Sequence, residues 1–162
     1  MLGLMQSQPL LISSLIEFAE RHHGDAEIVS RRVEGDVHRY TYRDLARRAR
    51  QLANVLEDMQ LQFSDRVATL AWNGYRHMEM YFGVSGSGRV LHTINPRLHP
   101  DQIAWIVNHA QDQVLCFDTS FLPLVQAVHA RCPTVKKWVA LCDADKLPAD
   151  SGIPGLVSYE AW

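Results

Sequence analysis

Cysteine and histidine are the side chains that most readily act as nucleophiles, bases or metal ligands. The cysteines are Cys116, Cys132 and Cys142, an odd number without a CxxC pair, which argues against a disulfide framework and against a zinc site. A cysteine nucleophile needs a lowered pKa. We expect the apolar run around Cys116 to raise the pKa of its thiol instead, and no residue beside Cys142 would activate that thiol.

The eight histidines show no HExxH or comparable ligand spacing. His22 and His23 are adjacent, so their side chains would diverge on a helix. His92, His99 and His109 are spread over the end of a predicted strand, a loop and the end of a predicted helix. The sequence therefore predicts no metal site.

The run GVSGSG at residues 83–88 is as rich in glycine as a phosphate-binding loop, but its position is wrong for one. Such a loop follows a strand and opens a helix, so that free N–H groups at the helix N-terminus face the anion. These glycines come at the end of a predicted helix and before a strand. They also miss the GxSxG spacing of a serine nucleophile by one residue. Because glycine has no side chain, we expect these residues to let the helix backbone approach the sheet closely.

Strand-like and helix-like runs alternate through the middle of the chain. Strands are predicted at residues 66–72, 89–94, 113–117 and 135–141, with helices at 75–85, 100–110 and 121–131. This alternation predicts parallel strands joined by right-handed crossovers. The expected fold class is α/β, a doubly wound, mostly parallel sheet of about four strands. In the first of these helices, Met78, Tyr81, Phe82 and Ser85 share one face, and Asn73 can cap it.

A helix and a β-hairpin are predicted before the sheet. Ser14 would open the helix in a capping box with Glu17, and Gly24 would end it in a left-handed turn. Its apolar face would hold Leu15, Phe18, Ala19 and His22. Residues 27–32 and 37–42 form the predicted hairpin, with turn residues at 34–36.

Thr41 is expected to cap the next helix, with Asp44 in the capping-box position. The predicted core stripe of that helix is Leu45, Ala49, Leu52, Ala53 and Leu56. Its arginines, which could contact phosphate, fit better as a solvated face because the net charge is not basic. They are Arg43, Arg47, Arg48 and Arg50.

In open α/β sheets, ligands bind beyond the carboxyl ends of the strands. These ends fall at residues 72–73, 95–97, 118–119 and 142–143. Arg97 is the strongest polar candidate and could hold an anion, although a loop arginine more often pairs with a carboxylate such as Asp101 or with a neighbouring subunit. Catalytic, cofactor-binding and metal-ligating residues are therefore predicted to be none.

Composition restricts the class of protein. At 162 residues, with 47% apolar and 21% charged residues, the chain fits one soluble globular domain. A net charge of −2 argues against a nucleic-acid-binding domain. The N-terminus lacks the basic region of a secretory signal, and no apolar run reaches the roughly 18 residues of a membrane span. We expect a cytoplasmic protein.

Several short motifs together carry a family resemblance. They are YTYRDL at residues 40–45, WNGYRH at 72–77, YFGV at 81–84, LHTINPRL at 91–98 and NHA at 108–110. In order and spacing the chain resembles the early part of acyl-CoA synthetases of the adenylate-forming, AMP-binding superfamily, specifically the medium- and long-chain fatty acid–CoA ligases.

The resemblance implies a reaction that this segment does not complete. The family uses ATP and Mg²⁺ to convert a carboxylic acid to an acyl-adenylate, then transfers the acyl group to the thiol of CoA. Its Ser/Thr/Gly-rich phosphate loop ending in Pro-Lys-Gly, its adenine and ribose motifs, its hinge and its C-terminal catalytic lysine have no counterpart here. The segment alone is therefore expected to be inactive and to bind no cofactor.

The expected organisation is the N-terminal part of the large domain of such a ligase. Residues 1–42 would form the helix and hairpin, 43–142 the βα core, and 143–162 a loop and the first turn of a helix. Its partners would be the remainder of the ligase chain and a second copy, contacted through the helix at 14–22 and the hairpin. Two alternatives remain open: a free-standing α/β binding or assembly module, and a flavodoxin-like nucleotide binder.

Overall fold

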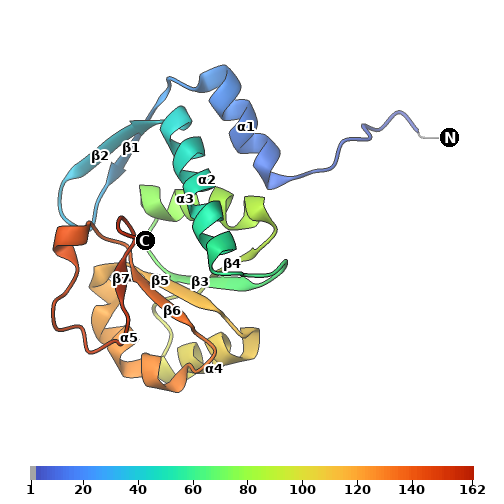
Figure 1. Ribbon diagram of the computed structural model, residues 1–162. Coiled ribbons are helices and arrows are strands. Elements are labelled where there is room, and N and C mark those ends of the chain that lie inside the picture. Colours follow the sequence, from blue (N-terminus) through green and yellow to red (C-terminus); the bar gives the residue numbers. More distant parts are fainter. Residues whose placement is uncertain (1–2) are drawn as a thin grey trace.

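A parallel sheet of five strands forms the centre of the protein, whose computed structural model describes residues 3–162. The strands lie in the order β4-β3-β5-β6-β7 (Figure 1). Their bounds are β3 (Arg66–Leu70), β4 (Val90–Thr93), β5 (Val114–Phe117), β6 (Lys137–Ala140) and β7 (Val157–Ser158). The predicted α/β class is confirmed, and the sheet has one strand more than expected.

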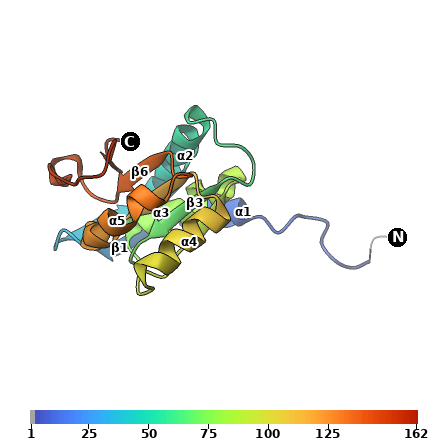
Figure 2. The same ribbon diagram turned by 90° about the horizontal axis from the view of Figure 1, so that it is seen from below.

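Helices cover both faces of the sheet (Figures 1 and 2). α2 (Tyr42–Asp58) and α3 (Tyr75–Gly83) pack on one face through Leu52, Leu56 and Met80. α4 (Pro100–Ala110) and α5 (Leu122–Val128) pack on the other, and short 3₁₀ turns lie at Ser85–Ser87, Thr119–Phe121, His129–Arg131 and Ala144–Lys146. Because side chains of a strand alternate between faces, β3 supplies Val67 to one core and Ala68 to the other.

The predicted hairpin and the helix that follows it are confirmed. β1 (Glu27–Arg31) and β2 (Val37–Thr41) pair antiparallel. Thr41 Oγ1 accepts a hydrogen bond from the backbone N–H of Asp44, and the Asp44 carboxylate accepts one from the backbone N–H of Thr41. This reciprocal capping box fixes the start of α2 directly after the hairpin.

The first helix differs from its prediction. α1 (Ile12–His23) begins without a side-chain cap, because the Ser14 hydroxyl donates to the carbonyl of Leu11 instead of accepting from the helix. Ile16 is its buried residue, whereas Leu15 and Phe18 are 63% and 58% exposed. Gly24 has ordinary right-handed angles. The helix therefore has apolar side chains on two faces. The face of Ile16 is buried in the fold, where α1 contacts α2 and α3, and the face of Leu15 and Phe18 is exposed.

The fully buried face of α3 is not the one that Met78, Tyr81, Phe82 and Ser85 share, and the predicted cap is wrong. Gly74 is its N-cap, in place of Asn73, and Ser30 Oγ accepts a hydrogen bond from the backbone N–H of Tyr75. Met78, Tyr81 and Phe82 lie half-buried or exposed. The buried residues are Tyr75, Arg76, His77, Glu79, Met80 and Gly83. The buried face of α3 thus carries two charged side chains, Arg76 and Glu79.

Gly83 allows a close approach, but to α2 and not to the sheet. A Cβ atom at Gly83 would lie 2.8 Å from the carbonyl oxygen of Ala49 and 2.9 Å from Leu52 Cδ2. The backbone carbonyl of Ala49 can move only together with its helix. A methyl group at Gly83 would therefore force α2 and α3 apart.

We expect Gly83→Ala to lower the free energy of unfolding by up to about 2 kcal/mol, since overpacking costs about 1–3 kcal/mol and the better helix propensity of alanine returns about 1. Gly86→Ala is the matched control, because its Cβ would meet Ser13 at an ordinary 3.7 Å. Urea unfolding of the two variants checks this expectation. Equal midpoints for both would contradict it.

The last residues form a strand and a turn. β7 pairs parallel with β6, which the prediction of an unfinished helix from residue 158 missed. Ser158 Oγ accepts from the backbone N–H of Ala161, and residues 159–161 make a turn. Between residues 3 and 162, no helix is long and apolar enough to cross a membrane.

Candidate functional site at the carboxyl ends of the strands

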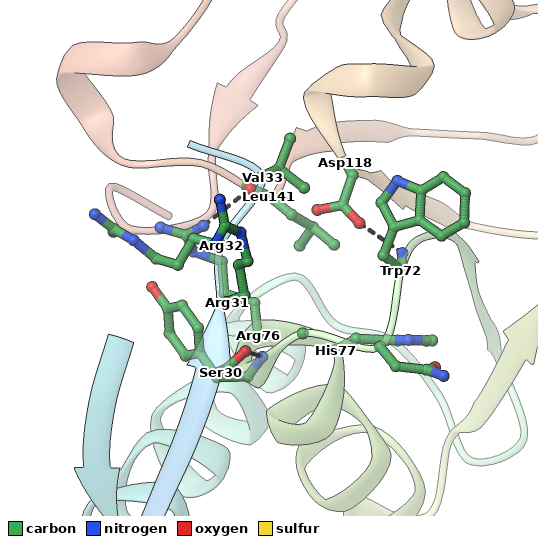
Figure 3. Close-up of a pocket in the computed structure, with 12 residues that line it drawn as sticks. Ser30, Arg31, Arg32, Val33, Trp72, Arg76, His77, Asp118 and Leu141 are labelled. Carbon is green, nitrogen blue, oxygen red and sulfur yellow. Dashed lines mark hydrogen bonds between the residues drawn. The ribbon is translucent and has the colours of Figure 1, made fainter. Parts of the chain in front are cut away.

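The sheet has a switch point between β3 and β5, the position at which doubly wound folds bind ligands. From β3 the chain crosses to β4 on one side, and β5 then lies on the other side of β3. The loops after β3 and β5 meet at this point. The backbone N–H of Trp72 donates to the Asp118 carboxylate at 2.6 Å (Figure 3). The indole N–H of Trp72 donates to Ser120 Oγ at 2.9 Å.

A small cavity of about 50 Å³ opens beside the Trp72–Asp118 bond. The end of β1 and the loop after it form its other wall (Figure 3). Its lining residues are Ser30, Arg31, Arg32, Val33, Trp72, Asn73, Gly74, Tyr75, Arg76, His77, Asp118 and Leu141. Pockets for cofactors and drug-sized ligands measure roughly 300–1,000 Å³. This cavity can hold a few water molecules but not a nucleotide.

Three of the four predicted strand ends lie at this cavity or beside it. Arg97 belongs to the fourth, which follows the edge strand β4, and its side chain is exposed. Asp101, its expected partner, instead accepts from Arg131 at 2.6 Å. Arg97 is therefore outside the site.

Arg76 is the centre of a buried charge cluster next to the cavity. Its side chain is 5% exposed and donates to Glu160 and Glu34 at 2.8 Å each, to the Leu141 carbonyl at 3.0 Å, and to Asp143. These partners come from the hairpin turn, the end of β6 and the last turn of the chain. One guanidinium thus holds three separate segments together through its planar set of donors.

Glu79 lies at the other end of the cluster and is fully buried. Its carboxylate accepts from Arg48 Nε at 2.7 Å and from the Tyr159 hydroxyl at 2.9 Å. Burial raises the pKa of Glu79, and the Arg48 guanidinium acts against that rise. Arg48 also donates to Glu160. The prediction that Arg48 belongs to a solvated face is therefore wrong.

Burial shifts the pKa values of the titratable groups near the cavity. Burial raises the pKa of Asp118 to about 6 and that of the Cys142 thiol to about 11. Burial also raises the pKa of Cys116, as expected from its apolar strand, and lowers the pKa of His77, whose Nε2 lies 3.1 Å from Thr69 Oγ1. Among residues 3–162, metal-ligating side chains form no group of three that could hold an ion.

Arg76, Glu79 and Glu160 were not singled out from the sequence, whereas Asp118 lies at one of the predicted strand ends. One signal was available: Arg76 and Glu79 are three residues apart, and so on one face of a helix that directly follows a buried strand. Their partners are far away in the sequence, up to 112 residues in the case of Arg48 and Glu160. Pattern reading along one helix cannot identify such partners.

A family comparison decides what kind of protein carries this site. The family model described as AMP-binding enzyme matches residues 15–159, which is most of the chain. This chain belongs to the AMP-binding enzyme family. The family resemblance in the sequence motifs is thereby confirmed.

Curated relatives of this chain include acyl-CoA ligases. It is 51% identical to 3-methylmercaptopropionyl-CoA ligase of Ruegeria pomeroyi over all of its 162 residues, which are 30% of that ligase. It is 46% identical to long-chain-fatty-acid–CoA ligase of Thermus thermophilus over 96% of this chain and 28% of that protein. The chain thus spans about 30% of the length of the relatives that it matches.

A solved structure shows the same fold. Anthranilate CoA ligase in complex with anthranoyl-AMP superposes with a TM-score of 0.78 over 98% of this chain and 29% of that protein, at 20% sequence identity. The five-stranded sheet with its hairpin is therefore a part of the fold of AMP-binding ligases.

Proposed function

We propose that this chain is the N-terminal scaffold segment of an ATP-dependent acyl-CoA ligase. The observation that carries the proposal is that relatives named as acyl-CoA ligases match the whole chain with about 30% of their length. In the complete ligase, ATP and Mg²⁺ would activate a fatty acid or a related carboxylic acid, and CoA would receive the acyl group. The remaining segments would bind all of these. A cytoplasmic location is in keeping with the three free cysteines.

The geometry of the segment supports a structural role. Its switch-point cavity has room for a few waters only. The arginines of its charge cluster form ion pairs with carboxylates of the same chain. Arg76 and Arg48 fasten the hairpin and the last turn to the sheet. The segment would thus supply a rigid wall against which the nucleotide-binding part of the ligase packs.

Activity measurements test this function directly. With ATP, Mg²⁺, CoA and a medium- or long-chain fatty acid, the 162-residue chain is expected to release no AMP above a protein-free control. A longer protein that continues into a Ser/Thr/Gly-rich loop ending in Pro-Lys-Gly is expected to release AMP and form acyl-CoA. Turnover by the 162-residue chain, or inactivity of the longer protein on every acid tried, would contradict the proposal.

We further propose that the ligase is a homodimer and that α1 contributes to its interface. One apolar stripe is formed by Leu15 and Phe18 of α1 and by Leu11, the residue before the helix. These side chains are 63%, 58% and 58% exposed, which is unusual for large apolar side chains. We expect Leu15→Glu and Phe18→Glu to convert the dimer to a monomer in size-exclusion chromatography with light scattering. Glu17→Gln, on the same helix, should leave the mass unchanged. A wild-type monomer at all concentrations would refute the interface.

A further inference from the structure

The hairpin has a free backbone edge along β1. In an antiparallel pair, only alternate residues bond to the partner strand, and the others point their N–H and C=O groups outward. Tyr42 N donates to Ala26 O and Arg32 N donates to Asp36 O, which fixes the phase of this ladder. Ile28 and Ser30 are then the residues bonded to β2.

Glu27, Val29 and Arg31 therefore present their backbone groups to the opposite edge. Within residues 3–162, no hydrogen bond outside the β1–β2 ladder is made by these backbone groups. A hairpin of two strands with an open edge is marginally stable by itself. The open edge is thus a place where another strand can add.

A groove of about 420 Å³ runs along this edge between β1 and α3. It is lined mainly by apolar surface, with Ile28 and Val29 on one side and Tyr75, Met78 and Tyr81 on the other. At a rise of about 3.3 Å, a strand separation of about 4.8 Å and a sheet thickness of about 10 Å, that volume holds about three residues of an extended strand.

We propose that this groove receives an extended strand from the part of the ligase that the chain does not span, so that the hairpin becomes a three-stranded sheet. An extended strand satisfies unpaired backbone groups, which a helix or a lipid surface cannot do. About 70% of the relatives' length lies outside this chain and is available to supply it.

The side chains beside the edge restrict the sequence of that strand. The groove is apolar in its middle, so alternate residues of the strand would be apolar. Arg31, at one end, is exposed and forms no ion pair with the other residues from 3 to 162. The strand would therefore carry an acidic residue opposite Arg31, whereas Glu27 at the other end already pairs with Arg39.

Residue-resolved amide hydrogen exchange tests the added strand. The proposal of an added strand rests on the proposed ligase function. The experiment therefore compares the longer ligase with the 162-residue chain. In the chain alone, the amides of Val29 and Arg31 should exchange about 100-fold faster than those of Ile28 and Ser30. In the longer ligase, Val29 and Arg31 should slow to the rates of Ile28 and Ser30. Fast exchange of Val29 and Arg31 in the longer ligase overturns the proposal.

A pair of proline variants gives a second readout. Val29→Pro removes an N–H that points into the groove. Arg39→Pro removes an N–H that points outward at the free edge of β2, on the other side of the hairpin. In the longer ligase, Val29→Pro should lower the melting midpoint by about 2 °C more than Arg39→Pro does. In the 162-residue chain, the two variants should have equal midpoints.

Other outcomes separate this proposal from the proposed function. A dimer of the 162-residue chain that already protects the Val29 amide would assign the edge to a second copy and would overturn the added strand. If the longer protein protects Val29 and Arg31 but releases no AMP, the strand stands and the ligase function fails. Exchange and turnover are measured independently, so neither result hides the other.

Discussion

Arg76→Ala is expected to lower the free energy of unfolding by about 3–5 kcal/mol, the cost of breaking a buried ion pair by removing one partner. The side chain of Arg76 is 5% exposed, and that of its partner Glu34 is 10% exposed. Without Arg76, the Glu34 carboxylate is left without a cation. Glu160 and Asp143 keep Arg48 and Arg32, which places the effect toward the lower end of the range.

Urea unfolding of the 162-residue chain measures this effect. Arg39→Ala is the control, because its pair with Glu27 is exposed on both sides and should be worth no more than about 1 kcal/mol. Adding Glu34→Gln to Arg76→Ala should recover part of the loss, since it removes the orphaned charge. If Arg76→Ala costs no more than Arg39→Ala, the cluster does not hold the three segments together.

Asp118→Asn is expected to stabilise the protein at pH 7.5 by about 1–3 kcal/mol and to stabilise it distinctly less at pH 4.5, since one pKa unit corresponds to about 1.4 kcal/mol. Burial raises the pKa of Asp118 to about 6 from an ordinary value of 3.8. Between these two values the folded state keeps a proton that the unfolded chain has lost. The stability due to this group therefore falls as pH rises from about 4 to about 6.

The variant removes that fall, because asparagine stays neutral and its amide oxygen can still accept from the backbone N–H of Trp72. Unfolding curves of both proteins at pH 4.5 and pH 7.5 give the comparison. Asp36→Asn is a control of opposite sign: the Arg32 guanidinium lowers the pKa of Asp36, so its neutralisation should destabilise at neutral pH. A difference between Asp118→Asn and wild type that is the same at both pH values would show that Asp118 does not titrate as stated.

Local chemistry explains what the sequence could predict of this fold. The capping box at Thr41 and Asp44, proline at the first position of α4, and the alternation of apolar strands with helices each depend on neighbours within a few residues. Those features were placed correctly, as was the hairpin. They are enough to define a doubly wound sheet, because short right-handed connections leave few other arrangements.

The remainder depended on contacts between distant segments. β7 has two residues and exists because β6 offers an edge, a fact absent from its own sequence. Leu15 and Ile16 are both apolar, and only the position of α2 decides that Ile16 is the buried one. The sequence pattern of α2 predicts that Arg48 lies at the surface, whereas in the fold it forms ion pairs with Glu79 and Glu160. The candidate site consists of such pairs, so sequence patterns could locate the strand ends but not the charges.

The charge cluster also orders events during synthesis. Arg32 and its partner Asp143 are 111 residues apart, and Arg48 and Glu160 are 112 apart. Ribosomes add about 5–20 residues per second, so Asp143 follows Arg32 by roughly 6–20 seconds. The hairpin therefore leaves the ribosome long before Asp143. Until then, Arg32 has only Asp36 as an ion-pair partner. A pause in translation before Asp143 would lengthen that interval.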